Sequence, residues 1–259
     1  MVAGGERKRA GAVGSENALD GTFRMAGNRD SLPTKRRADD ISAFLDKLAR
    51  TPNVGPAEGR GRLMFAMDAT ASRERSWDQA CHIQSEMFKA TDGLGGLEVQ
   101  LVYFRGFGEC KSSPWVSKSD ELVRRMTAVR CHGGRTQIGK VLHHAARETA
   151  VRRVNALVFV GDSMEEEIDD LCHRAGELGM LGVPMFLFQE GQDPVAEGAF
   201  RQFARLTNGA YCRFDAASAG QLRDLLGAVA AFAAGGRRAL EDYGKRAGGA
   251  ALRLTAQVK

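Results

Sequence analysis

Five oxygen-bearing side chains stand in three short stretches of the sequence where a metal ion could be held. The first stretch, "DATAS", places Asp68, Thr70 and Ser72 at alternate positions directly after an apolar run. Alternate side chains of an extended chain point the same way, so this carboxylate and these two hydroxyls can face one ion. Oxygen ligands of this kind suit a hard cation such as Mg²⁺, which takes near-octahedral geometry and keeps several waters.

The other two stretches supply one oxygen-bearing side chain each. Thr136 opens a helical pattern after "CHGGR", and Asp162 follows the apolar run "NALVFVG". Ligands of open α/β sheets bind outside the carboxyl ends of the strands, where the strand order reverses. We therefore expect Asp68, Thr136 and Asp162 to converge on one edge of a sheet, with two carboxylates serving the ion.

The elements that must position these residues alternate along the chain from Arg62 onward. Apolar runs predict strands over 62–67, 97–105, 155–161, 183–189 and 209–214. Helical spacing predicts helices over 76–90, 118–129, 136–150, 165–178, 195–207 and 219–236. Strands that are apolar throughout need cover on both faces. The sequence therefore predicts an α/β fold, a doubly wound and mostly parallel central sheet flanked by helices on both faces.

Composition divides the chain into four segments. Residues 1–38 are rich in Gly, Ala, Arg and Asp, which predicts a disordered N-terminal arm because little apolar surface can be buried. Residues 39–61 predict a short amphipathic helix and a linker, and 62–236 the α/β domain. The glycine pair at 235–236 is expected to end the last helix, which leaves 237–259 as a C-terminal extension.

Charge and cysteine content narrow the class of protein. A net charge of +5 is mildly basic, so nucleic acid is not an expected partner. The five cysteines are scattered singly without a C-x-x-C pair, which favours reduced thiols in a cytoplasmic protein. The first residues carry no apolar core of a secretory signal, and no apolar run reaches the roughly 18 residues of a membrane span.

The three stretches together resemble the von Willebrand factor A (VWA) domain and its metal-ion-dependent adhesion site (MIDAS). That site is written D-x-S-x-S, then a Thr in a second loop, then an Asp after a later strand. "DATAS" is similar to the first element, with Thr70 where the family usually has Ser. "GGRTQ" is similar to the second, with Arg135 between the glycine pair and Thr136, and "VFVGDS" is similar to the third, where the family commonly has T-D-G. The resemblance covers residues 60–235.

The resemblance implies a bacterial-type intracellular VWA protein that binds other proteins and has no catalytic residue. The implied ion is Mg²⁺, with Mn²⁺ or Ca²⁺ as alternatives. Its implied ligands are Asp68, Thr70, Ser72, Thr136 and Asp162. The open coordination position would accept a Glu or Asp carboxylate from a protein partner. Bacterial proteins of this sort often work with AAA+ ATPases, so an adaptor or accessory role is implied.

Two other functions fit parts of the pattern. "GDSMEE" also resembles motif IV of the haloacid dehalogenase (HAD) phosphatases, which would make Asp68 the nucleophile. Most of those enzymes need an Asp two positions later as general acid and base, and Thr70 stands there instead. A structural VWA protein without a working metal site is the second alternative. In isolation, "DATAS" is also compatible with a turn in which Ser72 or Ser76 caps a helix.

Several further residues have two readings each. Arg135 and His132 could contact an acidic partner near the ion or serve as ordinary solvated loop residues. Trp115 could anchor an interface on the same rim or cover a local apolar patch. The acidic run at 165–170 complements the dipole of the helix that it begins, and a solvated helix face is expected for it.

Overall fold

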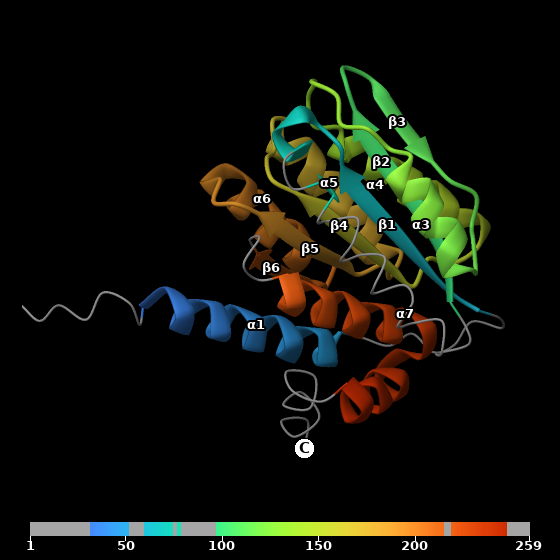
Figure 1. Cartoon of the computed structure of the whole chain (residues 1–259), viewed down its shortest axis with the longest axis vertical. Helices are drawn as coiled ribbons and strands as arrows, with labels where there is room; N and C mark the ends of the chain where they lie inside the picture. The colour runs from blue at the N-terminus through green and yellow to red at the C-terminus, as the bar shows by residue number, and fades with distance from the viewer. Residues whose placement is uncertain (1–31, 52–59, 75–76, 79–96, 215–218, 248–259) are drawn as a thin grey trace, which may run out of the picture.

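The computed structural model describes residues 32–51, 60–74, 77–78, 97–214 and 219–247. Within them, six strands form one sheet in the order β3-β2-β1-β4-β5-β6 (Figure 1). The strands are β1 (Gly61–Asp68), β2 (Leu97–Arg105), β3 (Glu109–Ser112), β4 (Ala156–Gly161), β5 (Met185–Glu190) and β6 (Ala210–Phe214). All neighbouring pairs are parallel except β2 and β3, which are antiparallel. The predicted doubly wound, mostly parallel sheet is confirmed.

Helices cover both faces of this sheet. They are α1 (Leu32–Arg50), α3 (Ser119–Thr127), α4 (Ile138–Val151), α5 (Ile168–Met180), α6 (Pro194–Leu206) and α7 (Ala219–Ala247). Helices α1, α3 and α7 share one apolar core with the sheet, and α4, α5 and α6 share the other. Every residue of β1 is buried, with Phe65 and Met67 in the first core and Met64 and Ala66 in the second. Burial on both faces is the reason that this strand is apolar throughout.

The sheet has its topological switch point at β1. The chain leaves β1 to form β2 on one side and later returns to form β4 on the other side. Loops that follow β1 and β4 therefore diverge, and the crevice between them lies at the carboxyl ends of both strands. Asp68 and Asp162 stand at this crevice, because β1 ends at Asp68 and β4 ends one residue before Asp162.

The first helix is longer than the sequence suggested. It begins at Leu32, so residues 32–38 are helical, although the sequence placed them in a disordered arm. Pro33 stands in the first turn, where a backbone N–H has no helical partner in any case and the fixed φ of proline suits a helix. The rest of the predicted arm, residues 1–31, and most of the helix predicted over 76–90 lie outside the described residues.

The last helix does not end at its glycine pair. Gly235 and Gly236 adopt non-helical φ/ψ values, with φ of +65° at Gly236, and the chain then resumes a helical course to Ala247. Beyond this kink, Leu240 is buried in the core, and Tyr243 packs against the same core. The glycines therefore redirect the chain, and residues 237–247, expected in an extension, cover the domain instead.

No helix in the described part of the chain combines the length and apolar character that crossing a membrane would require.

Candidate metal site

Two aspartates lie side by side at the crevice between β1 and β4. Met67 pairs with Val160 in the parallel ladder, so Asp68 stands opposite Gly161 and Asp162 follows one step later. Neighbouring strands lie about 4.8 Å apart. A Cβ atom placed on Gly161 would lie 3.5 Å from the Cβ atom of Asp68, which shows how closely the two strand ends pass. The register thus brings two carboxylates from distant parts of the sequence to one place.

Each of these carboxylates has a buried oxygen without a hydrogen-bond partner. Asp68 is fully buried, and its Oδ1 accepts the backbone N–H of Thr70 at 2.8 Å. Within the described residues, Asp68 Oδ2 and Asp162 Oδ1 are buried and accept no hydrogen bond. Leaving a buried polar atom unpaired costs about 1–3 kcal/mol, and more when the group is charged. A divalent cation between the two aspartates would satisfy both oxygens and offset both charges.

The protonation of Asp68 reflects this environment. The pKa of Asp68 is raised from 3.8 to about 6, mainly by burial and in smaller part by the nearby Asp162 carboxylate. Hydrogen bonds from Thr70 and the charge of Arg73 act in the opposite direction and lower the pKa. A carboxylate whose pKa is raised by burial and by a neighbouring charge is typical of functional sites.

The two hydroxyls of "DATAS" lie against each other. Thr70 Oγ1 is 3.1 Å from Ser72 Oγ. Thr70 is the N-cap residue of the short 3-10 helix η1 (Ala71–Arg73), but its side chain makes no capping hydrogen bond. Ser72 lies inside η1 and not at a cap position, whereas Ser76 is outside the described residues. The helix near Trp77 that Ser72 or Ser76 could cap lies mostly outside the described residues, so that alternative stays a prediction.

Hydrogen bonds tie the Thr136 loop to the loops that follow β1 and β4. The backbone N–H of His132 donates to the carbonyl of Ala69 at 3.1 Å, which joins this loop to "DATAS". Thr136 Oγ1 accepts the backbone N–H of Glu165 at 3.0 Å, and the Thr136 N–H donates to Glu165 Oε2 at 3.1 Å. Thr136 is 4% exposed. The three stretches that carry the predicted ligands are thus cross-linked at one edge of the sheet.

A glycine allows the Thr136 loop to pass over the β2–β3 hairpin. A Cβ atom on Gly134 would lie 2.0 Å from the carbonyl oxygen of Gly106, closer than any side chain could tolerate. The next residue, Arg135, donates its backbone N–H to the same carbonyl at 3.2 Å. Gln137 also donates to Gly106 through its side-chain amide, at 3.3 Å. Gly134 is therefore required by this close approach, whereas a Cβ atom on Gly133 would meet no atom within 4 Å.

A buried arginine that sequence reasoning did not single out holds the strand ends together. Arg73 is 1% exposed, and its Nη1 donates to the backbone carbonyls of Asp68 at 3.0 Å and Val160 at 3.4 Å. Its Nε also donates to Glu190 at 2.9 Å, at the end of β5. In the sequence, Arg73 belongs to the charged run "SRER", which carries no signal that this arginine is buried.

The acidic run at 165–170 has a different role from the one expected. Asp169 and Asp170 do lie in the first turn of α5, where their charge complements the helix dipole. Glu165 instead binds Thr136, and the Glu166 carboxylate accepts the N–H groups of Ile138 and of Gly139, the latter at 3.0 Å. Glu166 thus caps the preceding helix, α4, which no local sequence pattern indicates.

Trp115 is not on the rim of the metal site. Its ring lies under the guanidinium of Arg62, whose carbon is 3.7 Å from the ring centroid, and its Nε1–H donates to Glu148 at 2.6 Å. Arg62 is near the start of β1, whereas Asp68 is at the end. Because β3 runs antiparallel to β2, it returns the chain to the opposite edge of the sheet before Trp115. The rim interpretation of Trp115 is therefore wrong.

The combined donor set fits a hard cation. Two carboxylates and three hydroxyls, all oxygen ligands, are the groups that Mg²⁺ and similar ions take in proteins. In the described part of the chain, no group of three or more His, Cys, Asp or Glu side chains is placed to hold a metal ion. An ion held at this crevice would therefore depend on the hydroxyls of Thr70, Ser72 and Thr136 in addition to the two aspartates.

Comparisons of sequence and of structure give different results. No protein-family model matches the sequence, and curated proteins show no significant match. A VWA protein from Catenulispora acidiphila superposes with a TM-score of 0.53 and 16% identity, over 67% of this chain and 43% of that one. An aerotolerance-related membrane protein from Bacteroides fragilis gives a TM-score of 0.52 and 18% identity, over 64% of this chain and 96% of that one.

A third similar structure carries a metal at its MIDAS. It is the proximal thread matrix protein 1 of the mussel byssus, described with a zinc-occupied MIDAS motif. It superposes with a TM-score of 0.52 and 14% identity, over 66% of this chain and 46% of that one. Identities this low speak to architecture alone. The chain described here has the fold of the von Willebrand factor A domains.

Proposed function

We propose that this chain is a Mg²⁺-dependent protein-binding module. Asp68, Thr70, Ser72, Thr136 and Asp162 would hold the ion, directly or through water. The observation that carries this proposal is the pair of buried oxygens on Asp68 and Asp162, at neighbouring strand ends, that have no hydrogen-bond partner in the part of the chain that the structure describes. Mn²⁺ and Ca²⁺ offer the same preference for oxygen ligands and remain alternatives to Mg²⁺.

The charge balance of this donor set favours an acidic partner. Two carboxylates neutralise a dication, and hydroxyls add no charge, so a third carboxylate can approach the ion without strong repulsion. A Glu or Asp side chain of a partner would then take the open coordination position. The rim offers further contacts, because Arg135 is exposed and Phe107, at the tip of the β2–β3 hairpin, is 87% exposed. An exposed aromatic residue next to a charged centre is a common feature of protein interfaces.

The wider role that we propose is that of an intracellular, cytoplasmic adaptor or accessory protein, with an AAA+ ATPase as a candidate partner. This part of the proposal rests on the resemblance of the three motifs to bacterial VWA proteins and not on a contact in the structure. Among similar structures, the VWA domain of SpRpn10 and the pilus adhesin SpaC have TM-scores of 0.50 and 0.53. Neither identifies a partner for this chain.

Affinity capture from native cells tests the proposal. The full chain is used as bait in Mg²⁺ and in chelator, beside the variant Asp68→Asn, which keeps the shape and the acceptor for Thr70. We expect partners that are captured only by the unsubstituted chain in Mg²⁺. Capture that is equal in all three conditions would contradict the proposal, and would favour a structural protein without a working metal site.

A phosphoester hydrolysis assay with Mg²⁺ distinguishes the enzyme alternative. Turnover that disappears in Asp68→Asn would establish the phosphatase and remove the binding module. We expect no turnover above that of Asp68→Asn, because Thr70 stands where a general acid and base would be needed and its hydroxyl lies against Ser72.

A further inference from the structure

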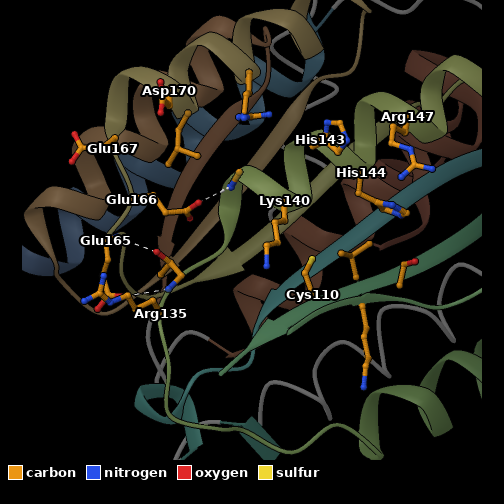
Figure 2. A pocket seen from close by; sticks show the side chains of 17 residues that line it. Cys110, Arg135, Lys140, His143, His144, Arg147, Glu165, Glu166, Glu167 and Asp170 are labelled. Atoms are coloured by element: carbon orange, nitrogen blue, oxygen red, sulfur yellow. Dashed lines mark hydrogen bonds between the residues drawn. The ribbon is translucent and has the colours of Figure 1, made fainter. Parts of the chain in front are cut away.

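A large groove opens directly beside the proposed metal site. Its volume is about 890 Å³, and Thr136 and Glu165 line one end of it. From there the groove runs along α4, with β3 on one side and the start of α5 on the other (Figure 2). Thr136 is also a proposed ligand of the ion, so the groove and the proposed metal site meet at this residue, and a partner segment at the site could continue into the groove.

The side of the groove formed by α4 and β3 is basic. We call the set Lys111, Lys140, His143 and Arg147 the basic wall. Figure 2 shows the last three projecting from α4. They recur at spacings of three and four residues, which places them on one face of the helix. His143 and Arg147 are exposed. Lys111 pairs with Glu109 at 2.8 Å, and Lys140 Nζ donates to the Gly108 carbonyl and to Gln137 Oε1, both at 2.8 Å. Within the described residues, neither Lys140 nor Arg147 forms a salt bridge, so Arg147 carries the charge that is most available to a ligand.

The other side of the groove carries the acidic residues 165–167 and 170, but two of these carboxylates are already engaged in hydrogen bonds. The carboxylates of Glu165 and Glu166 accept backbone N–H groups of the Thr136 loop and of α4. Glu166 thereby also occupies the N-terminus of α4, so this helix end is not open to an anion. Glu167 and Asp170 lie at the opposite side from Lys140 and Arg147 (Figure 2). An anionic ligand in the groove would therefore be drawn to the basic wall.

The length of α4 indicates how far apart two acidic residues of a peptide in the groove would lie. Arg147 is nine residues beyond Ile138, the first residue of α4, which corresponds to about 14 Å along the helix axis at 1.5 Å per residue. An extended peptide covers that distance in about four residues at 3.3 Å each. Side chains four residues apart in an extended peptide point to the same side. Ile138 lies two residues after the proposed ligand Thr136, so acidic side chains at positions i and i+4 would match the distance from the Thr136 end of the groove to Arg147.

We propose that this groove binds the extended continuation of the partner segment whose carboxylate reaches the ion, and selects a second acidic residue four positions away. The inference rests on the proposed function, because it takes the ion as the first anchor. It names the partner by chemistry: an extended segment with acidic residues at i and i+4. The basic wall then supplies specificity at the second position, where an exposed charge pair contributes up to about 1 kcal/mol, or fivefold in affinity.

Nuclear magnetic resonance titration of the ¹⁵N-labelled full chain tests the inference. The probes are nine-residue Gly/Ser peptides with one Glu, with two Glu at i and i+1, and with two Glu at i and i+4. Each is titrated in Mg²⁺ and in chelator. We expect the i, i+4 peptide to bind three- to fivefold more tightly than the others and to shift amide signals along α4. In Arg147→Glu this advantage should vanish. Arg124→Glu, an exposed arginine on α3 at the opposite face of the sheet, should keep it.

Each other outcome has a definite meaning. Equal affinity of Arg147→Glu and the unsubstituted chain for the i, i+4 peptide overturns the inference. So does the absence of α4 shifts with every peptide, or α4 shifts that inorganic phosphate or ATP produces and the peptides do not. If the i, i+4 preference persists in chelator and in Asp68→Asn, the groove selects acidic peptides without the ion, so the Mg²⁺-dependent function fails and the ion is not the first anchor. If binding depends on Mg²⁺ but not on Arg147, the function stands and the groove inference fails.

Discussion

The charge of Asp68 should destabilise the metal-free protein at neutral pH. Burial and the neighbouring Asp162 raise the pKa of Asp68 from 3.8 to about 6. A carboxyl with a raised pKa in the folded state favours folding in its protonated form. Its contribution is therefore fully present below about pH 4 and is lost as the pH rises through 6. Replacing Asp68 by Asn removes the charge and keeps an oxygen that can accept the Thr70 N–H.

The size of the effect follows from the shift. The pKa of Asp68 rises by about two units, and each unit corresponds to about 1.36 kcal/mol. At pH 7.5 the charged Asp68 side chain therefore lowers the free energy of unfolding by ~3 kcal/mol. In chelator, we expect Asp68→Asn to be more stable than the unsubstituted chain by up to that amount. For a domain of this size it corresponds to a rise in melting temperature of about 6–12 °C. The difference should shrink as the pH falls from 7.5 through 6. Saturating Mg²⁺, at a hundred times its Kd, should stabilise the unsubstituted chain by about 2.7 kcal/mol and Asp68→Asn by far less.

Thermal melting followed by circular dichroism, at pH 5, 6 and 7.5 with chelator or Mg²⁺, measures both effects. Asp120→Asn serves as the matched control, since Asp120 is exposed on α3 and away from the crevice. We expect the control to melt within about 2 °C of the unsubstituted chain under all conditions. The reasoning is refuted if Asp68→Asn melts lower than the unsubstituted chain in chelator at pH 7.5. It is also refuted if Mg²⁺ raises the melting temperature of both proteins equally.

Three further substitutions test the structural inferences. Glu166→Ala should lower the free energy of unfolding by about 1 kcal/mol because α4 loses its cap. The control Glu167→Ala changes an exposed residue and should not lower it, and thermal melting compares the two variants. Gly134→Ala should displace the loop before Thr136, since its Cβ has no room, and should weaken Mg²⁺ binding in calorimetric titration; unchanged affinity would contradict this. Leu240→Ala should cost about 2–5 kcal/mol in urea unfolding if residues after the kink belong to the core, and little if they do not.

Most of the architecture could be predicted from the pattern of apolar residues in the sequence. Strands buried on both faces need apolar residues at every position, so β1, β4 and β5 appear as unbroken apolar runs. β3 escaped detection because "ECKS" is a short and polar edge strand whose residues are half-buried or exposed. The glycine pair in α7 predicts a helix end, because local rules favour termination at glycine. The burial of Leu240 shows that tertiary packing overrode that rule.

The candidate site was also predictable only in its local features. The five predicted ligands come from the types and the order of residues at strand ends. The structure places Asp68 beside Asp162 and ties the Thr136 loop to both flanking loops. The supporting contacts of Arg73 and Glu166 were not predicted, because each joins segments more than 25 residues apart in the sequence. Charged residues that bind distant backbone atoms leave no local pattern to find.

The sequence by itself determined the alternation of strands and helices, and the oxygen-bearing residues at the ends of β1 and β4. Both are local properties, because a short run of residue types is enough to indicate a buried strand and the position at which it ends. Only the tertiary structure decided that, among the described residues, Asp68 and Asp162 each have a buried oxygen without a hydrogen-bond partner. It also decided that Trp115 lies at the far edge and that basic side chains line a groove along α4 beside Thr136. The physical reason is that these properties depend on strand order, register and exposure, which arise only when distant segments pack together.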